Sequence, residues 1–246
     1  MRKLRGLLFA DPAIVLATIF FGTISLIVSF FDNTGALQIR VARAWARTLL
    51  TVSGVRVHVE GLDRIDPTGS YVFISNHLSF MDTPVALAHI PAQFRFLAKR
   101  GLFQIPLLGT HLSRAGHIPV PRGDPRAAVR TLQAAAEAIQ QKKISMLIFP
   151  EGGRSEGVLR SFKEGGAYIA IRAGVPVVPL VMIGTRQILP YGAGVVLSGD
   201  VTLRIMPPID TSHFTLKDRG SLTAQLHALI LNELEPAHES ATTRLG

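Results

Sequence analysis

The sequence predicts an α/β fold: a mostly parallel or mixed sheet flanked by helices, preceded by an N-terminal membrane-embedded helical motif. Two observations within residues 54–246 support the fold class. Short apolar runs typical of buried strands alternate with helical patterns. The clearest helical pattern, at 123–143, has an N-cap aspartate, a proline at the first helical position and lysines at its end. A third observation, the uncharged apolar run 13–31, predicts the membrane motif.

The run 13–31 is long enough to enter a membrane. As a helix it extends about 28 Å, close to the ~30 Å hydrocarbon core. A cleaved signal peptide is the alternative, since three basic residues lie within positions 2–5, but the run exceeds a usual h-region and no good cleavage site follows it. Basic residues flank the run on both sides. This symmetry favours a re-entrant helical pair with both ends on the cytoplasmic side over a single span.

The next segment, 36–52, has the pattern of an amphipathic helix. Arg40, Arg43 and Arg47 share one face, and apolar residues including Trp45 occupy the other. Such a helix beside a membrane segment is typical of one lying among lipid headgroups; the alternative is a surface helix packed on its own domain. We therefore expect two parts: a membrane-embedded or interfacial segment at 1–53 and an α/β domain with a C-terminal helix at 54–246.

The remaining elements follow in chain order. Strands are expected at 55–61, 71–75, 94–100, 144–150 and 175–184, with a closing hairpin at 195–209. Helices are expected at 79–89, 123–143, 165–174 and 222–235. The net charge of +9 suits a polyanion. Anionic lipid fits the apolar N-terminus, whereas nucleic acid does not, because no basic run is interleaved with aromatic residues.

The stretch "NHLSFMD" follows the buried strand expected at 71–75 and contains His77 and Asp82. If the chain turns into a helix here, Asp82 can contact the imidazole. A carboxylate on one ring nitrogen fixes the tautomer and leaves the other nitrogen free to accept a proton. The alternative is a histidine satisfied in a turn beside an aspartate that caps a helix. The spacing alone does not separate these two interpretations.

A second polar stretch, "FPEGGRSEG", follows the strand expected at 144–150. Adjacent glycines can expose backbone N–H groups, and Arg154 beside them can bind a phosphate through two N–H groups. Glu151 would repel a phosphate, so it is easier to explain as an acceptor for a substrate hydroxyl or as a partner that holds an arginine. The structural alternative is a strand-to-helix turn in which Gly152 and its neighbour serve the backbone.

Two further cations lie where ligands can bind. Arg122 precedes the helix expected at 123–143, and a helix N-terminus beside an arginine suits an anion. Lys99 follows a strand. No paired histidine spacing indicates a metal site, and the absence of cysteine excludes thiolate ligands, disulfides and a cysteine nucleophile. Ser79 could be considered as a nucleophile, but its surroundings in the sequence offer nothing specific.

Together these residues indicate a histidine base that activates a hydroxyl group of the substrate or water, because no protein nucleophile is evident. A phosphate-bearing amphiphile with a free hydroxyl fits the base, the arginines and the apolar N-terminus. The ordered blocks "NHLSFMD", "GHIPVPR", "FPEGGRS" and "VPVVPL" resemble the four blocks of the glycerolipid acyltransferase superfamily. The resemblance is strongest to bacterial 1-acyl-sn-glycerol-3-phosphate acyltransferases and covers about residues 45–210.

The resemblance implies roles for individual residues. His77 would be the general base and Asp82 its orienting partner. The residues expected to bind the glycerol phosphate are Arg122, Glu151, Gly152 and Arg154, with Lys99 as a lesser candidate. The chain departs from the family pattern where Gly153 replaces a usual threonine. It also departs at Ile118, near a usual aromatic, and at Pro121, where an acid is usual, so the glycerol contacts are less certain.

The implied reaction is acyl transfer from acyl-coenzyme A or acyl carrier protein to the sn-2 hydroxyl of lysophosphatidic acid, giving phosphatidic acid. No metal or bound cofactor is expected. The implied location is the inner, cytoplasmic membrane, with the active site on the cytoplasmic side. Two alternatives remain: an acyltransferase for another lysolipid, including a lyso-ornithine lipid, and a non-catalytic lipid-binding protein. The sequence does not indicate chain-length preference or oligomeric state.

Overall fold

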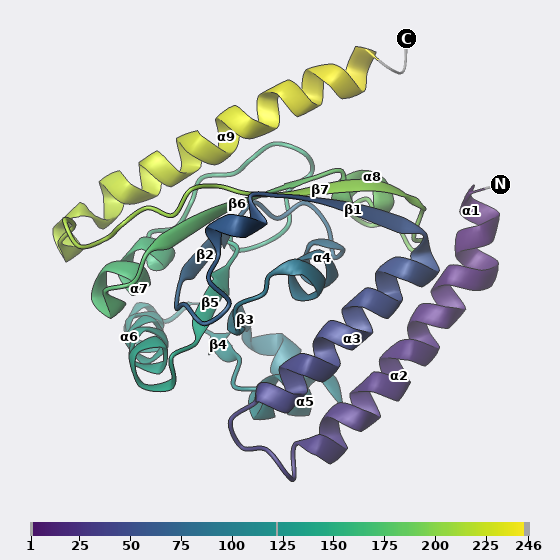
Figure 1. Cartoon of the computed structure of the whole chain (residues 1–246), viewed down its shortest axis with the longest axis horizontal. Helices are drawn as coiled ribbons and strands as arrows, with labels where there is room; N and C mark the ends of the chain where they lie inside the picture. Colours follow the sequence, from purple (N-terminus) through teal and green to yellow (C-terminus); the bar gives the residue numbers. More distant parts are fainter. Residues whose placement is uncertain (1, 122, 244–246) are drawn as a thin grey trace.

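The computed structural model describes residues 2–121 and 123–243, which form a sheet with helices on both faces (Figure 1). The seven strands lie in the order β1-β7-β6-β2-β5-β3-β4. The β6–β7 pair is antiparallel and the other neighbouring pairs are parallel, which confirms the mixed, mostly parallel sheet. The strands are β1 (Val55–Glu60), β2 (Val72–Ser75), β3 (Phe94–Lys99), β4 (Ile118–Val120), β5 (Ser145–Ile148), β6 (Val177–Ile183) and β7 (Gly199–Ile205).

Both faces of the sheet are covered by helices. On β2, Phe73 lies in a core shared with α3 and α4, whereas Val72 and Ile74 lie in a second core shared with α6, α7 and α9. Because both faces are buried, the central strands are apolar throughout instead of alternating. The helices are α3 (Ala36–Ser53), α4 (Asp82–His89), α5 (Leu108–Arg114), α6 (Pro125–Lys142), α7 (Gly165–Ala173), α8 (Thr185–Ile188) and α9 (Arg219–Thr243), with 3-10 turns η2 (Leu62–Arg64), η3 (Arg100–Gln104) and η4 (Leu216–Asp218).

The closing hairpin predicted at 195–209 is wrong. Within this stretch only Gly199–Ile205 forms a strand, β7, and it pairs antiparallel with β6 and parallel with β1. Residue Leu197 instead donates its N–H to the carbonyl of Ile188 (2.8 Å). The partner strand β1 lies far away in the sequence. Local turn residues therefore could not reveal that Gly199 begins a strand instead of forming a turn.

The N-terminal helices form an antiparallel pair on one side of the body (Figure 1). α1 (Arg2–Arg5), a π-helical turn η1 (Gly6–Ala10) and α2 (Asp11–Val28) follow one another, and α3 returns beside α2. Trp45 of α3 donates its indole N–H to the hydroxyl of Thr18 on α2 (3.1 Å). This contact joins the two helices partway along their length.

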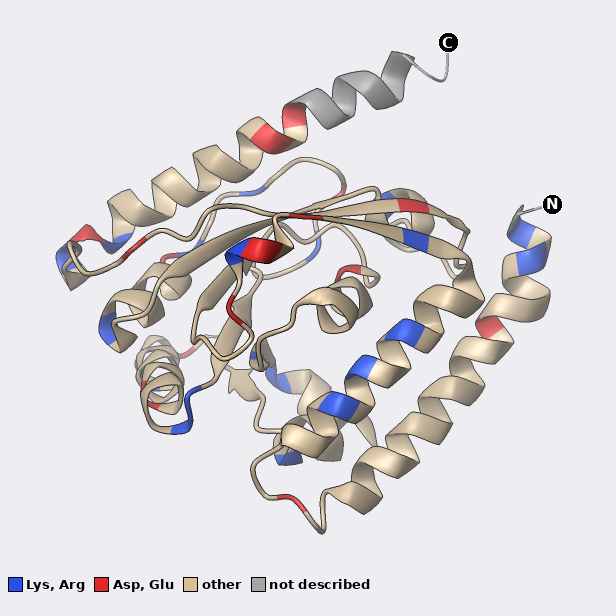
Figure 2. Cartoon of the chain, viewed as in Figure 1, with Lys and Arg blue, Asp and Glu red and all other residues tan. Residues whose placement is uncertain are grey.

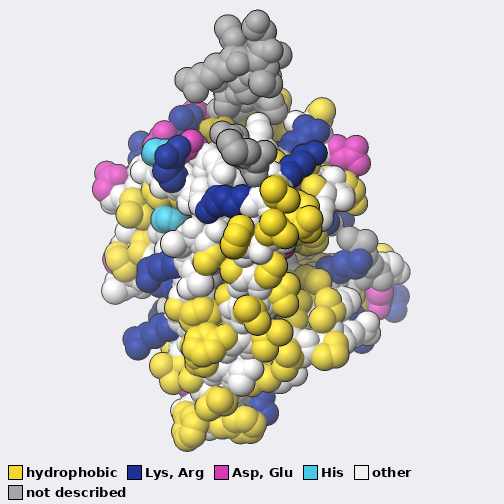
Figure 3. All heavy atoms as spheres, turned by 90° about the vertical axis from the view of Figure 1, so that its right-hand side faces the viewer, with side chains coloured by type: hydrophobic (Ala, Val, Ile, Leu, Met, Phe, Trp, Pro, Cys, Tyr) yellow, Lys and Arg dark blue, Asp and Glu magenta, His cyan; other side chains and the backbone are white. Residues whose placement is uncertain are grey.

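The helix Lys3–Val28 is long and apolar enough to cross a membrane, and few of its residues are buried. Figure 2 shows almost no charged positions along α2, and Figure 3 shows an apolar surface on this side of the molecule. Its exposed large side chains include Val15, Leu16, Ile19, Phe20 and Ile27. A continuous apolar face of this kind fits association with a membrane.

α3 is amphipathic, but one arginine points differently from the prediction. Arg40 and Arg47 are exposed, whereas the guanidinium of Arg43 donates to the backbone carbonyls of residues 90–92 at 2.7–2.9 Å. These carbonyls follow the end of α4 and have no helical partner, so the guanidinium satisfies them. The prediction that Arg43 shares an outward basic face with Arg40 and Arg47 is therefore wrong. α3 packs on its own domain on one side and against α2 on the other.

Candidate active site

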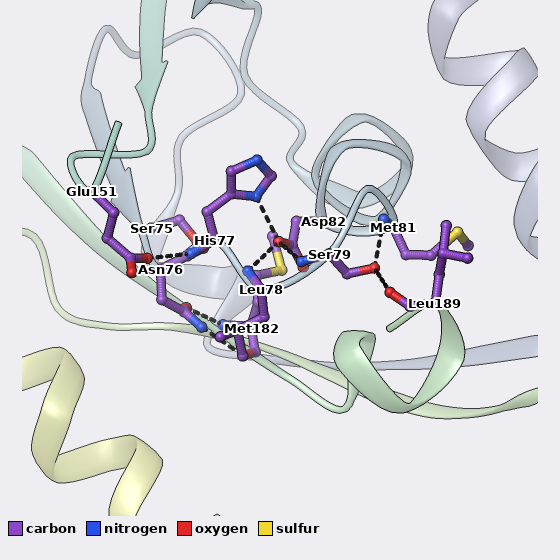
Figure 4. A network of polar contacts seen from close by, with 10 residues as sticks. All are labelled: Ser75, Asn76, His77, Leu78, Ser79, Met81, Asp82, Glu151, Met182 and Leu189. Carbon is purple, nitrogen blue, oxygen red and sulfur yellow. Dashed lines mark hydrogen bonds and ion pairs between the residues drawn. The ribbon is translucent and has the colours of Figure 1, made fainter. Parts of the chain in front are cut away.

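The chain leaves β2 at the carboxyl edge of the sheet, where polar contacts hold it in place (Figure 4). Asn76 is fully buried, and its side-chain amide pairs with the backbone of Met182 in the neighbouring strand β6. It donates to the carbonyl at 2.9 Å and accepts from the N–H at 2.8 Å. Asn76 therefore fixes the start of the loop to the sheet through both the donor and the acceptor of its side-chain amide.

The predicted contact between His77 and Asp82 is present. His77 Nδ1 lies 2.7 Å from Asp82 Oδ2, and the same oxygen accepts from the N–H groups of Leu78 (2.8 Å) and Ser79 (2.9 Å). The Asp82 side chain is completely buried at the start of α4. Because Oδ2 accepts these two N–H groups, it acts as an acceptor toward His77 as well, so Nδ1 is the donor and Nε2 of the neutral ring keeps its lone pair. Figure 4 shows that second nitrogen pointing away from Asp82.

The His77 ring is also held from the side. Phe149, at the end of β5, stacks on the imidazole with ring centroids 4.0 Å apart and planes 16° from parallel. The His77 side chain is only 17% exposed. The stacking and the Asp82 contact together fix both the position and the plane of the ring, while one nitrogen stays accessible.

Glu151 joins the two loops that follow β2 and β5. Its Oε1 accepts from the N–H of His77 (2.7 Å), and its Oε2 accepts from the N–H of Arg160 (3.0 Å). In return, the N–H of Ser155 donates to the carbonyl of His77 (2.9 Å). Burial raises the pKa of Glu151, and the hydrogen bonds oppose that rise. The carboxylate therefore positions backbone, which is a different task from the hydroxyl or arginine contact we expected; any contact with substrate stays a prediction.

The two glycines after Glu151 differ. Gly152 has φ +73°, a conformation that favours glycine, and an added Cβ would lie 2.9 Å from Nζ of Lys163. Gly153 has open space around the position of a Cβ. The backbone conformation thus favours glycine at 152, whereas a Cβ at 153, where the family pattern usually has threonine, would meet no atom within 4 Å.

The cations expected to bind phosphate are less tightly held. Arg154 lies over two aromatic rings, 3.5 Å from the centroid of Phe80 and 4.7 Å from that of Tyr191. Lys99 is exposed at the carboxyl end of β3. Among residues 2–121 and 123–243, neither cation forms a hydrogen bond or an ion pair. Arg122 lies outside the described residues, so its predicted role stays a prediction.

Three residues that hold the site in place were missed by sequence reasoning. Asn76, Phe149 and Ser155 lie inside the quoted blocks, but nothing in their spacing indicates which partner each would contact. Ser79 was considered as a nucleophile; instead, its buried hydroxyl donates to the carbonyl of Leu189 (2.8 Å) and accepts from the N–H of Met81 (3.1 Å). Across the described part of the chain, no three His, Asp or Glu side chains are grouped to hold a metal ion.

Comparison with known proteins shows which family the chain resembles. Residues 56–183 match the family model described as Acyltransferase. The chain is 37% identical over 175 residues to a chloroplastic 1-acyl-sn-glycerol-3-phosphate acyltransferase of Arabidopsis thaliana, covering 70% of this chain and 48% of the relative. It is 34% identical to a chloroplastic enzyme of the same name from Brassica napus, covering 84% and 61%. The chain therefore spans about half to three fifths of these relatives.

A solved structure matches nearly the whole chain. The crystal structure of the 1-acyl-sn-glycerophosphate acyltransferase PlsC from Thermotoga maritima superposes with a TM-score of 0.80 and 27% identity, covering 96% of this chain and 97% of that one. The match includes the N-terminal helices as well as the sheet, since so little of either chain is left out. On the family match over 56–183 and this shared fold, the chain belongs to the acyltransferase family.

Proposed function

We propose that the chain transfers an acyl group from a thioester to the sn-2 hydroxyl of 1-acyl-glycerol-3-phosphate, producing phosphatidic acid. The observation that carries the proposal is the His77–Asp82 pair, in which Nδ1 is bonded and Nε2 is free. The nearby hydroxyl of Ser79 donates to a backbone carbonyl and so is poorly placed to act as a nucleophile. The printed names of the relatives and of the Thermotoga structure support the choice of acceptor.

The chemistry follows from the free nitrogen. Nε2 of His77 takes the proton of the sn-2 hydroxyl while that oxygen attacks the thioester carbonyl. Asp82 stabilises the resulting imidazolium through Nδ1. The tetrahedral intermediate collapses, the C–S bond breaks, and the sulfur leaves with the proton returned by His77. The products are the ester and a free thiol, and the reaction needs no covalent enzyme intermediate.

The acceptor phosphate is proposed to bind at the arginine side of the site, through Arg154 together with Arg122 and, less directly, Lys99. Gly152 supplies the backbone turn that carries Arg154, and Glu151 holds that turn against His77. The proposed donors are acyl-coenzyme A or acyl carrier protein, both acidic, which suits a chain of net charge +9. We place the reaction at the cytoplasmic face of a bacterial inner membrane, where these thioesters occur.

The experiment measures thiol release by the detergent-purified chain with and without lysophosphatidic acid, using acyl-coenzyme A and acylated carrier protein in parallel. Release that depends on the lipid, with phosphatidic acid as product, supports the proposal and identifies the donor. Two matched acceptors, a lysophosphatidylcholine and a phosphate-free lyso-ornithine lipid, test the acceptor. If transfer to either lipid were faster, that lipid would replace lysophosphatidic acid as the proposed acceptor. If no combination of donor and acceptor released thiol, a non-catalytic lipid-binding protein would be favoured.

The phosphate assignment has its own test in Arg154→Ala. A charge-assisted hydrogen bond contributes about 1.5–3 kcal/mol, so KM for lysophosphatidic acid should rise about 10- to 100-fold. The matched control is Arg160→Ala, which removes an exposed arginine whose backbone N–H, not its side chain, bonds Glu151. An unchanged KM in Arg154→Ala would rule out a phosphate contact.

A further inference from the structure

Two exposed aromatic side chains flank the arginine of the site. The guanidinium of Arg154 lies 3.5 Å from the ring centroid of Phe80 and 4.7 Å from that of Tyr191. Both rings are more than half exposed, at 61% and 52%. Phe80 belongs to the loop that carries His77, and Tyr191 follows α8, which is far away in the sequence. The three side chains thus bring together three separate loops.

The stacking restricts the arginine without using its hydrogen-bond donors. All five N–H donors of a guanidinium lie in its plane, and at 3.5 Å from its central carbon the ring of Phe80 is at the separation of stacked groups, over a face and not at the N–H edge. Within the described residues, no acceptor bonds these donors. The arrangement therefore holds a cation whose N–H edge is free for an anion, and less side-chain freedom is lost when the anion binds.

A partly buried hydrogen bond joins the two aromatic segments to each other. Ser79, next to Phe80, donates its hydroxyl to the carbonyl of Leu189, two residues before Tyr191, at 2.8 Å. Ser79 itself is held by the Asp82 carboxylate, which accepts its backbone N–H at 2.9 Å. The aspartate that orients His77 therefore also helps to place the ring under Arg154, which connects the base to the anion site.

We propose that Phe80 and Tyr191 are positioning residues that hold Arg154 with its N–H edge toward the phosphate of the acceptor lipid. The inference rests on the proposed function for the identity of that lipid. It assigns the two aromatic rings to binding of the acceptor, not to proton transfer. It also predicts that Arg154→Lys weakens binding of the lipid, since an ammonium group has no planar face to stack and no bidentate edge.

The test measures the Kd of lysophosphatidic acid by calorimetry on the full chain in detergent, with initial-rate kinetics on the same samples. Phe80→Leu should raise Kd and KM about three- to tenfold and leave kcat within about twofold. Tyr191→Leu should have a smaller effect, because its ring is farther away. Phe80→Tyr and Tyr191→Phe should restore binding, and Leu62→Ala, an exposed apolar position in η2, is the control.

A double-mutant cycle decides whether the rings act through the arginine. In an Arg154→Gln background, Phe80→Leu should cause no further rise in Kd. An equal rise in both backgrounds, or a loss of kcat with KM unchanged, would overturn the inference. The wild-type protein tests the proposed function separately. If it binds the lipid but transfers no acyl group, the proposed reaction is refuted, while the Kd values of the variants still test the role of the two rings. A wild type that does not bind the lipid would overturn both.

Discussion

Three histidines of this chain, His77, His111 and His117, occupy two opposite environments. His77 contacts the carboxylate of Asp82 and keeps one nitrogen near the surface. His111 and His117 instead lie between α2, α5 and β3, and no carboxylate of the described residues contacts them. His111 Nδ1 is 2.6 Å from the hydroxyl of Ser25, and His117 Nδ1 accepts the N–H of Phe96 at 2.9 Å.

Burial explains the different chemistry of the second pair. It lowers the pKa of His111 from 6.5 to about 4, and it lowers the pKa of His117 well below 6.5, with the charges of His111 and Arg95 adding to the effect. These two rings are therefore held neutral and serve packing. A histidine with a carboxylate on one nitrogen and an accessible second nitrogen is the one suited to accept and release a proton.

The largest expected effect comes from His77→Ala. Loss of a general base should lower kcat of the folded enzyme by roughly 10²- to 10⁴-fold, and some stability should be lost as well, because the ring is only 17% exposed and its removal takes a hydrogen-bond partner from the buried Asp82. His117→Ala is the matched contrast: it should lower stability, since it leaves the N–H of Phe96 unpaired, and affect kcat of the folded fraction little. A His77→Ala enzyme within a few-fold of wild type would show that the base lies elsewhere.

Asp82→Asn should follow, with kcat reduced by about 10²-fold or more. The asparagine amide can donate to His77 Nδ1, which would shift the ring proton to Nε2 and abolish its basicity. Steady-state kinetics across pH 6–9 would measure the change, and circular dichroism would check the fold. Because Oδ2 also accepts the N–H groups of Leu78 and Ser79, a loss of stability of about 1–3 kcal/mol should accompany it. Full activity in this variant would contradict the orienting role.

Titration of the buried histidines His111 and His117 should change the free energy of unfolding with pH and leave turnover unaffected. The folded-state pKa of His111 lies below its ordinary value, so its contribution is fully present above about pH 6.5 and is lost as pH falls toward 4. The free energy of unfolding should fall by at most about 3 kcal/mol through titration of His111. Chemical denaturation in detergent between pH 7.5 and 4.5 should show this loss, and His111→Asn should reduce it. An identical pH dependence in the variant would mean that other groups cause the loss.

Much of the fold could be predicted because its elements are locally specified. The helix at 125–142 begins at Asp124, whose carboxylate accepts the N–H of Ala127 at 2.9 Å, as the N-cap pattern indicated. The central strands were evident from their continuous apolar runs. The place of β7 between β1 and β6 was not, since it depends on a strand about 140 residues away. The inward turn of Arg43 likewise depends on carbonyls that α4 leaves unpaired.

The site divides in the same way. The His77–Asp82 contact was predictable because one turn of chain brings the two side chains together. The contact between Glu151 and the backbone of His77, and the stacking of Phe149 on its ring, join segments more than 70 residues apart. The type of a residue shows which hydrogen bonds its side chain can form, but it does not show which distant group will be the partner. Glu151 was therefore recognised as unusual in a phosphate site without its actual contacts being foreseen.

Ser79→Ala is the smallest expected effect and separates a structural hydroxyl from a catalytic one beside His77. The change leaves the carbonyl of Leu189 without its buried donor and should lower the free energy of unfolding by about 1–3 kcal/mol. Turnover should stay within about tenfold of wild type, because the hydroxyl already donates to a carbonyl and His77 activates the substrate instead. Denaturation and kinetics on the same preparation would measure both. A drop in kcat as large as that of His77→Ala, without loss of stability, would make Ser79 a nucleophile and replace direct transfer by an acyl-enzyme.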